Sequence, residues 1–159
     1  SFMDASFLSQ INSIIKATGV NPETIELEIT EGALIEPSPQ VIQTIAELKR
    51  IGFTLAIDDF GTGYSSLAYL QRFNVDKLKI DRSFVKDVLT DAQGEAITSA
   101  IISMAKSLNL EILAEGVEDK EQLAFLKEKG CEIYQGFYFS KPIPVKEFEA
   151  LIRNYEAQV

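Results

Sequence analysis

The strongest constraint on the fold is a regular alternation of short apolar strands and amphipathic helices along the whole chain. Five segments have the residue pattern of strands, and a helical pattern separates most of them from the next. The expected strands are residues 26–30, 53–58, 77–81, 111–115 and 131–135. Strands that alternate with helices form parallel βα units with right-handed crossovers. The sequence therefore predicts an α/β fold.

Proline, glycine and capping residues set the ends of the expected helices. Pro39 begins a helix that Gly52 ends. Asp119, with Gln122 three residues later, has the pattern of a capping box before a helix that Gly130 ends. A first helix contains apolar residues at helical spacing from Phe7 to Ile15 and stops at Gly19, and the other expected helices are residues 66–72, 95–108 and 145–155.

Polar residues at the strand ends separate two possible α/β architectures. They are Glu28 and Glu31, Asp58 and Asp59, Lys79 and Asp81, Glu115 and Glu118, and Gln135. In an open doubly wound sheet, five strands spread over about 20 Å, at about 4.8 Å per neighbour, which is too wide for one site. In a (β/α)8 barrel the same ends meet on one face, where barrel active sites lie. We therefore expect a barrel.

The length of the chain limits how much of a barrel it can form. A complete barrel has eight strands and about 250 residues, whereas the 159 residues of this chain fit one domain with five or six units. We expect a partial TIM-like (β/α) barrel with five parallel βα units, in which the first strands are absent. Such a barrel exposes two strand edges, which favours a homodimer or association through those open edges.

The composition excludes several classes of function. The chain has no histidine and one cysteine, Cys131, which excludes Ser-His-Asp and Cys-His catalysis, imidazole zinc sites and an internal disulfide. Its net charge of −9 disfavours binding to DNA, RNA or an anionic membrane surface. No apolar run reaches the roughly 18 residues of a membrane span. We expect a cytoplasmic protein, or the cytoplasmic part of a larger multidomain protein.

Four carboxylates are the best candidates for chemistry: Glu28, Asp58, Asp59 and Glu115. Carboxylates that converge without histidine are typical of a site for Mg²⁺ or Mn²⁺. Two such ions about 4 Å apart can bind a phosphodiester and activate a water molecule. Lys79 would hold that water or neutralise the phosphate in the transition state.

Six short motifs follow one another in the chain: EITE at 28–31, DDFGTGYSS at 58–66, LKID at 78–81, AEGVE at 114–118, QG at 135–136 and KP at 141–142. Their order, spacing and identity over residues 20–145 resemble the EAL domain, a family of bacterial phosphodiesterases that linearise cyclic di-GMP. The resemblance implies a TIM-like barrel and a two-metal site, with Mg²⁺ or Mn²⁺, that hydrolyses cyclic di-GMP to linear pGpG.

The resemblance also implies a role for each matching residue. The metal ligands would be Glu28, Asp58, Asp59 and Glu115. The catalytic residues would be Glu115, Lys79, Gln135 and Glu118. Lys79 would position the catalytic water, Gln135 would assist at the metal or its water, and Glu118 would contact the substrate or support the site. The supporting residues would be Glu31, which anchors the loop from Asp59 to Ser66, the loop residues Gly61, Thr62 and Gly63, and Asp81 near Lys79.

Two motifs of the family are missing from this sequence. The Glu-Ala-Leu segment that names the family supplies a metal ligand on the first strand, and an Asn ligand lies on the next. Residues 149–151 spell the same tripeptide, but in an expected helix. The resemblance implies that residues 1–159 are the C-terminal two-thirds of a single EAL domain, with impaired hydrolysis when alone. A non-catalytic cyclic di-GMP receptor and a dimerisation module are the alternatives.

Overall fold

Five parallel strands form one sheet in the order β1-β2-β3-β4-β5. The computed structural model describes residues 6–34, 38–62, 70 and 73–157. The strands are β1 (Glu26–Thr30), β2 (Thr54–Phe60), β3 (Lys77–Ile80), β4 (Glu111–Glu115) and β5 (Ile133–Gln135). Each strand pairs in parallel with the next strand in the chain. The predicted α/β fold with five parallel strands is confirmed.

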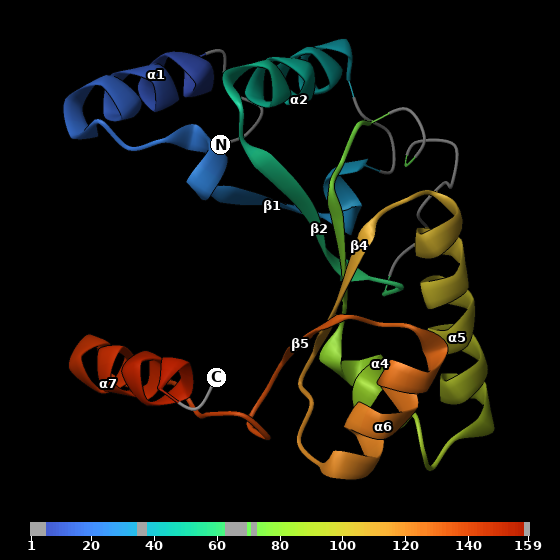
Figure 1. The fold of residues 1–159 in the computed structure, drawn as a ribbon. Helices are drawn as coiled ribbons and strands as arrows, with labels where there is room; N and C mark the ends of the chain where they lie inside the picture. The colour runs from blue at the N-terminus through green and yellow to red at the C-terminus, as the bar shows by residue number, and fades with distance from the viewer. Residues whose placement is uncertain (1–5, 35–37, 63–69, 71–72, 158–159) are drawn as a thin grey trace.

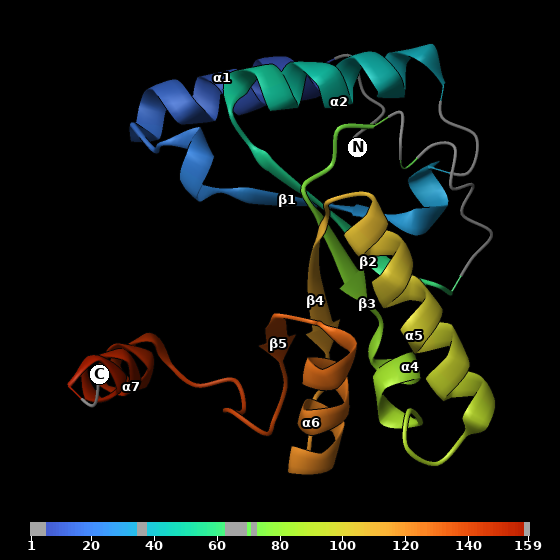
Figure 2. The same cartoon turned by 45° about the vertical axis from the view of Figure 1, so that its right-hand side comes forward.

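The helices surround this sheet unevenly. They are α1 (Phe7–Thr18), α2 (Pro39–Ile51), α4 (Arg82–Lys86), α5 (Ala92–Ser107), α6 (Lys120–Lys129) and α7 (Val145–Glu156), with short 3-10 turns η1 (Pro22–Thr24) and η2 (Glu31–Leu34). Helices α1 and α2 lie side by side at one end of the sheet, and α4, α5 and α6 cluster at the other (Figure 1). Helix α7 stands apart from both groups, and a 45° turn leaves it separate (Figure 2).

Capping residues set the ends of two helices, and one of these residues, Ser38, was not predicted. The Ser38 side chain accepts a hydrogen bond from the backbone N–H of Val41 and starts α2. Asp119 and Gln122 form the reciprocal capping box of α6. Gly52 ends α2 in a left-handed conformation, with φ of 114°. Local sequence therefore sets both ends of α2 and the start of α6.

One face of the sheet packs against the helices and forms the core. Alternation along a strand sends successive side chains to opposite faces. On β3, Leu78 and Ile80 lie in the apolar core and are fully buried. Lys77 and Lys79 alternate with them and form ion pairs with carboxylates on β1 and β4. The face opposite the core is therefore charged.

Two layers of ion pairs cross this charged face. In the first, the Nζ of Lys77 lies 2.5 Å from the Oε2 of Glu26 on β1 and 3.8 Å from the Oε2 of Glu111 on β4. Lys79 occupies the second layer, one side-chain repeat nearer the carboxyl ends of the strands. The polar residues were predicted to meet at this end of the sheet, where the strands have their carboxyl ends.

Several element boundaries differ from the sequence prediction. Strand β2 continues to Phe60 instead of ending at 58, and β5 begins at Ile133 instead of 131. Asp81 leaves β3 and caps α4, a short helix that was not predicted, by accepting from the backbone N–H of Ser83. The helix expected at 66–72 lies outside the described residues, apart from residue 70.

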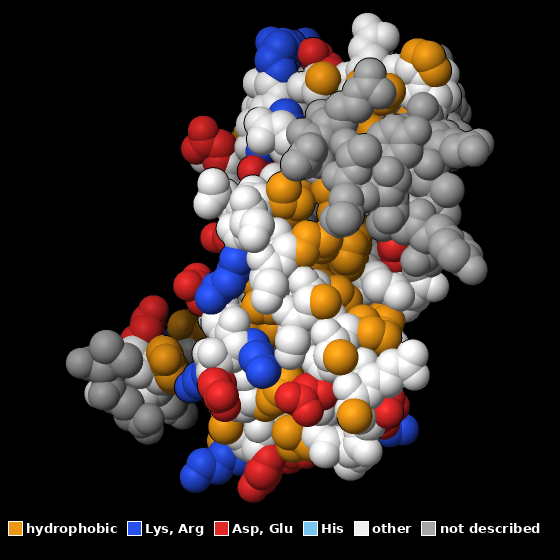
Figure 3. Space-filling view, turned by 90° about the vertical axis from the view of Figure 1, so that its right-hand side faces the viewer, with side chains coloured by type: hydrophobic (Ala, Val, Ile, Leu, Met, Phe, Trp, Pro, Cys, Tyr) orange, Lys and Arg blue, Asp and Glu red, His pale blue; other side chains and the backbone are white. Residues whose placement is uncertain are grey.

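The outer surface of the helices is mixed in character. Figure 3 shows the face formed by α5 and α6, where charged side chains of both signs lie between apolar ones. Within the described residues, no helix is long and apolar enough to cross a membrane.

Candidate active site

Lys79 lies at the centre of an ionic cluster near the carboxyl end of the sheet. Its Nζ is 2.5 Å from the Oε1 of Glu28 on β1, 2.8 Å from the Oε1 of Glu115 on β4 and 3.5 Å from the Oδ1 of Asp58 on β2. Strand β3 lies between β2 and β4 in a parallel sheet. The three carboxylates therefore come from strands on both sides of the lysine and meet over it.

The carboxylates keep the Lys79 side chain charged. Its side chain is only 7% exposed, and burial alone lowers the pKa of an ammonium group. Hydrogen bonds to Glu115 and Glu28 outweigh that effect, so the pKa of Lys79 lies above its usual value. These carboxylates therefore favour the charged form of Lys79, which acts as a hydrogen-bond donor to them.

A β-bulge brings Asp58 and Asp59 to the same edge. The pairing of β2 with β3 shifts register between Ile57 and Phe60, which inserts one extra residue on β2. Asp59 has a positive φ of 56°, in the left-handed region that non-glycine residues seldom occupy. Adjacent strand residues otherwise point to opposite faces. The bulge, instead of the expected strand end, lets both carboxylates reach the site.

The turn after β2 holds this conformation. The backbone N–H of Thr62 donates to the carbonyl of Asp59 at 3.3 Å, and the Thr62 hydroxyl donates to the same carbonyl at 2.8 Å. Gly61 has a φ of 98°. Gly63, also expected in the supporting loop, lies outside the described residues.

Three of the four predicted ligands form a compact acidic group. Asp58, Asp59 and Glu115 each place one carboxylate oxygen within 4.8 Å of the others. The negative charge of Asp58, together with burial, raises the pKa of Asp59. Glu28 lies outside this group and is bound to Lys79 instead. Glu28 therefore belongs to the ionic cluster around Lys79, but not to the acidic group.

The donor set of this acidic group fits a divalent cation. All its side-chain donors are carboxylate oxygens, which Mg²⁺, Mn²⁺ and Ca²⁺ prefer. Glu28, Asp58 and Glu115 contact one ammonium group, and Asp59 lies beside two of them, so a bound cation would relieve the repulsion among the four carboxylates. Asp58, Asp59 and Glu115 would hold it.

Glu31 connects the end of β1 to the turn after β2. Its side chain is buried, with 3% exposure, and its Oε2 accepts a hydrogen bond from the backbone N–H of Gly61 at 3.1 Å. Space at Gly61 is limited, because a Cβ there would lie 2.8 Å from the ring of Phe84. Glu31 thus contacts the backbone two residues after Asp59.

The substitution Glu31→Ala should loosen this turn. It leaves the part-buried Gly61 N–H without this acceptor, which costs about 1 kcal/mol, the low end of the range for a buried donor. We expect a lower free energy of unfolding in urea and faster amide exchange at Gly61. Glu31→Gln keeps an acceptor oxygen in place and is the matched control. Equal exchange at Gly61 in both variants would contradict this role.

Asp81 supports the site from the start of α4. Besides the Ser83 backbone N–H at 2.9 Å, it accepts from the Ser83 hydroxyl. Burial raises the pKa of a carboxyl group, but these two hydrogen bonds outweigh it and lower the pKa of Asp81. Asp81 also interacts with Asp59, whose pKa it raises.

The remaining predicted residues line a neighbouring pocket of about 200 Å³. Its walls are Arg82, Glu115, Gly116, Glu118, Gln135, Gly136 and Phe137. Pockets for drug-sized ligands span about 300–1,000 Å³, so this one has room for a single ring system. Glu115 belongs to both the pocket and the ionic cluster. The pocket therefore opens beside the acidic group.

Sequence reasoning missed two residues of this pocket, Arg82 and Phe137. Each directly follows one of the motifs, LKID and QG respectively. Gly116, with a φ of 73°, explains why Arg82 is close: a Cβ at Gly116 would lie 2.6 Å from that of Arg82. Both residues could have been predicted from the sequence, because each lies directly next to a motif.

Comparison with known proteins adds an independent observation. The model of the EAL domain family matches residues 1–142. The chain belongs to the EAL domain family. Cyclic di-GMP phosphodiesterase NbdA of Pseudomonas aeruginosa is 45% identical over 151 residues, which is 95% of this chain and 19% of that protein. The chain therefore spans about a fifth of the length of NbdA.

Solved EAL structures match the fold as well. The PaMucR phosphodiesterase in complex with cyclic di-GMP has a TM-score of 0.88 and 37% identity, over 92% of this chain and 60% of that one. Klebsiella pneumoniae BlrP1, solved with manganese and cyclic di-GMP, has a TM-score of 0.79 and 33% identity, over 89% of this chain and 36% of that one. This EAL domain chain therefore covers part of the TIM-like barrel.

Proposed function

We propose that this chain is the C-terminal part of an EAL domain whose parent hydrolyses cyclic di-GMP to linear pGpG with two divalent cations. The observation that carries the proposal is the contact of Lys79 with Glu28, Glu115 and Asp58, beside the acidic group. The Lys79 ammonium group thus lies among carboxylate oxygens that can bind divalent cations. We further propose that the domain acts in the cytoplasm.

In this proposal, the residues of the cluster have different roles. Asp58, Asp59 and Glu115 would hold metal, and bound divalent cations would supply charge stabilisation and a more acidic water. Lys79 donates a hydrogen bond to the attacking water or to a phosphate oxygen, and it does not accept a proton because its pKa is raised. Its contact with Glu28 and Glu115 fixes where that donor points.

The adjacent pocket gives the substrate a second point of contact. Glu118 and Gln135 line it with Arg82 and Phe137. A guanine base inserted there would meet a carboxylate acceptor and an aromatic ring, while the phosphodiester would lie at Glu115. In the proposal, the pocket orients one nucleotide and the acidic group acts on the phosphate next to it.

The substitution Asp58→Ala tests the proposal. We expect the 159-residue chain with Mn²⁺ to convert cyclic di-GMP to pGpG slowly, as measured by chromatography. Two ligand motifs of the family are absent from it, and loss of ligands weakens a metal site. Asp58→Ala should reduce that turnover further, by about 10²-fold or more.

The matched control is Asp76→Ala, at a carboxylate that contacts Lys49 and the backbone N–H of Leu55, away from the acidic group. It should lower stability without a comparable loss of turnover. Turnover that survives in Asp58→Ala would contradict the proposed site. If the chain binds cyclic di-GMP with no turnover, and a chain extended through the missing motifs is also inactive, the receptor alternative replaces hydrolysis.

A further inference from the structure

The turn that carries Asp59 has a backbone conformation that non-glycine residues seldom adopt. Asp59 has a φ of 56°, in the left-handed region, and Gly61 has a φ of 98°. Asp59 is also a member of the acidic group, with Asp58 and Glu115. A non-glycine residue keeps a left-handed backbone only where the surrounding structure holds it there. The contacts around this turn therefore decide whether the Asp59 carboxylate stays in the acidic group.

Hydrogen bonds hold the backbone of the turn from the side of β1 and from within. The Gly61 N–H donates to the Oε2 of Glu31, which follows β1, at 3.1 Å. The N–H and the hydroxyl of Thr62 both donate to the carbonyl of Asp59. These bonds fix the path of the backbone on one side of Gly61.

Apolar side chains of two helices reach the same turn from the other side. A Cβ at Gly61 would lie 2.8 Å from the Cε2 of Phe84 on α4, 3.1 Å from its Cζ and 3.0 Å from the Cδ1 of Ile101 on α5. Carbon atoms in contact normally lie about 3.5–4.0 Å apart. The edge of the Phe84 ring therefore lies directly against Gly61, in the space where any other residue would have its side chain.

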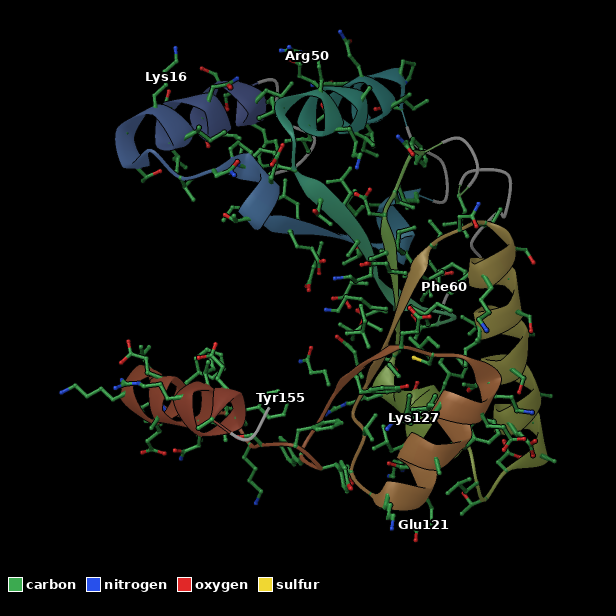
Figure 4. The ribbon with its side chains drawn as sticks, in the orientation of Figure 1. Lys16, Arg50, Phe60, Glu121, Lys127 and Tyr155 are labelled. Atoms are coloured by element: carbon green, nitrogen blue, oxygen red, sulfur yellow. The ribbon has the colours of Figure 1, made fainter. Side chains whose placement is uncertain are left out.

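The packing of α4 holds the Phe84 ring in this place. Phe84 is partly buried and packs against the apolar core, and the next residue, Val85, is fully buried in that core. Asp81 caps α4 directly after β3, so the helix begins at a fixed point of the sheet. Figure 4 shows Phe60, the last residue of β2, on the side of the sheet where α5 lies. Phe60 is 6% exposed, so the residue before Gly61 is packed as well.

Helix α4 also touches the turn that follows β4. A Cβ at Gly116 would lie 2.6 Å from the Cβ of Arg82, the first residue of α4. Gly116 directly follows Glu115, another member of the acidic group. One short helix therefore packs against the turn that follows Asp59 and against the turn that follows Glu115. Its position sets how far apart these two turns lie.

We propose that Phe84 is a positioning residue for the divalent-cation site, because its ring holds the turn at Gly61 and thereby keeps the Asp59 carboxylate beside Asp58 and Glu115. Phe84 itself contacts neither metal nor substrate. The inference rests on the proposed function for the assignment of Asp59 as a metal ligand. Outer-shell residues that orient a ligand typically change metal affinity by about 10–100-fold when they are replaced. A shorter side chain at position 84 leaves space into which the turn relaxes, and the Asp59 carboxylate moves with it.

A double-mutant cycle tests the contact between Phe84 and Gly61 without metal. Gly61→Ala and Phe84→Leu are made singly and together, and urea unfolding gives the stability of each protein. The added methyl group meets the ring in the native background, whereas leucine lacks the outer ring atoms. The strain of alanine at a φ of 98° is present in both backgrounds and cancels in the cycle. We expect Gly61→Ala to raise the unfolding equilibrium constant at least about tenfold more in the native background than in Phe84→Leu. Additive effects would overturn the proposal.

Mn²⁺ binding tests the positioning role itself. Electron paramagnetic resonance of free Mn²⁺ measures the affinity of the 159-residue chain, and Phe84→Leu should weaken it at least about tenfold. Val85→Ala, in the core part of the same helix, is the matched control, and it should lower stability in urea and leave the Mn²⁺ affinity unchanged. Equal affinity in the native chain and Phe84→Leu, or equal weakening in both variants, would overturn the proposal.

Asp58→Ala separates this inference from the proposed function. If Asp58→Ala weakens Mn²⁺ binding and Phe84→Leu does not, the metal site stands and the positioning role is wrong. If Asp58→Ala leaves Mn²⁺ binding unchanged, the proposed metal site is wrong, and the role of Phe84 falls with it.

Discussion

Lys79→Met should abolish cyclic di-GMP turnover and lower stability in the absence of metal. The substitution removes the ammonium that contacts three carboxylates, and leaves them facing one another. Removing one partner of a buried ion pair costs about 3–5 kcal/mol, but these carboxylates are partly exposed, so we expect about 1–3 kcal/mol in urea unfolding. Turnover should fall by at least about 10²-fold, because the fixed donor at the reacting phosphate is lost.

Metal should rescue the stability of this variant but not its activity. Without the ammonium, a divalent cation is the remaining source of positive charge among Glu28, Asp58 and Glu115. We therefore expect Mn²⁺ to raise the melting temperature of Lys79→Met more than that of the native chain. An equal response of the two proteins, or turnover that persists in Lys79→Met, would contradict the assigned role.

Lys77→Met is the matched control for Lys79→Met. Lys77 lies on the same strand and the same face, two residues earlier, and is 2.5 Å from Glu26. Its loss should lower stability to a similar degree, because that side chain is 14% exposed. It should keep turnover and show no added response to Mn²⁺, since the acidic group is untouched.

Gly136→Ala should cause the largest loss of stability of the substitutions considered. A Cβ at this position would lie 2.1 Å from the carbonyl oxygen of Val117 and 2.4 Å from its backbone nitrogen. Backbone atoms cannot rotate away as a side chain does, so the whole segment must shift. We expect a cost of about 3–5 kcal/mol in urea unfolding, above the usual range for overpacking.

The same substitution should disturb the pocket. The Val117 N–H donates to the carbonyl of Gln135, and the Val117 carbonyl accepts from Tyr138, both at 3.0 Å. A shift at Gly136 breaks these contacts and moves Gln135 away from Glu115. Gly32→Ala is the control, because a Cβ there meets no atom within 4 Å. Similar stability of the two variants would show that the backbone contact at Val117 is absent.

Much of the fold was predictable because capping residues and the alternation of apolar and polar residues predict the same helices and strands. Capping at Asp119 and the alternation on β3 each specify the element in which they occur. The acids at the strand ends were predictable too, since parallel strands bring their carboxyl ends to one edge. The structure places Lys79 with Glu28, Asp58 and Glu115 at that edge.

The remaining features depend on geometry that a linear pattern does not contain. The bulge at Asp58 and Asp59 depends on the register between β2 and β3, which the residues of β2 alone do not specify. The separation of Glu28 from the acidic group depends on the reach of the Lys79 side chain. The exposure of α7 was not predictable either, because its apolar stripe is typical of a buried helix, whereas none of its residues is buried within the described part of the chain.

The most direct test of the account is the binding of cyclic di-GMP measured by calorimetry with and without Ca²⁺. BlrP1 forms a calcium complex with cyclic di-GMP, so this ion permits binding to an EAL domain to be measured. We expect binding to the native chain that requires Ca²⁺, and loss of that binding in Asp58→Asn, which keeps the shape of the side chain and removes its charge. Binding that is unchanged in Asp58→Asn, or no binding with Ca²⁺ present, would contradict the assignment of this acidic group as a metal-dependent cyclic di-GMP site.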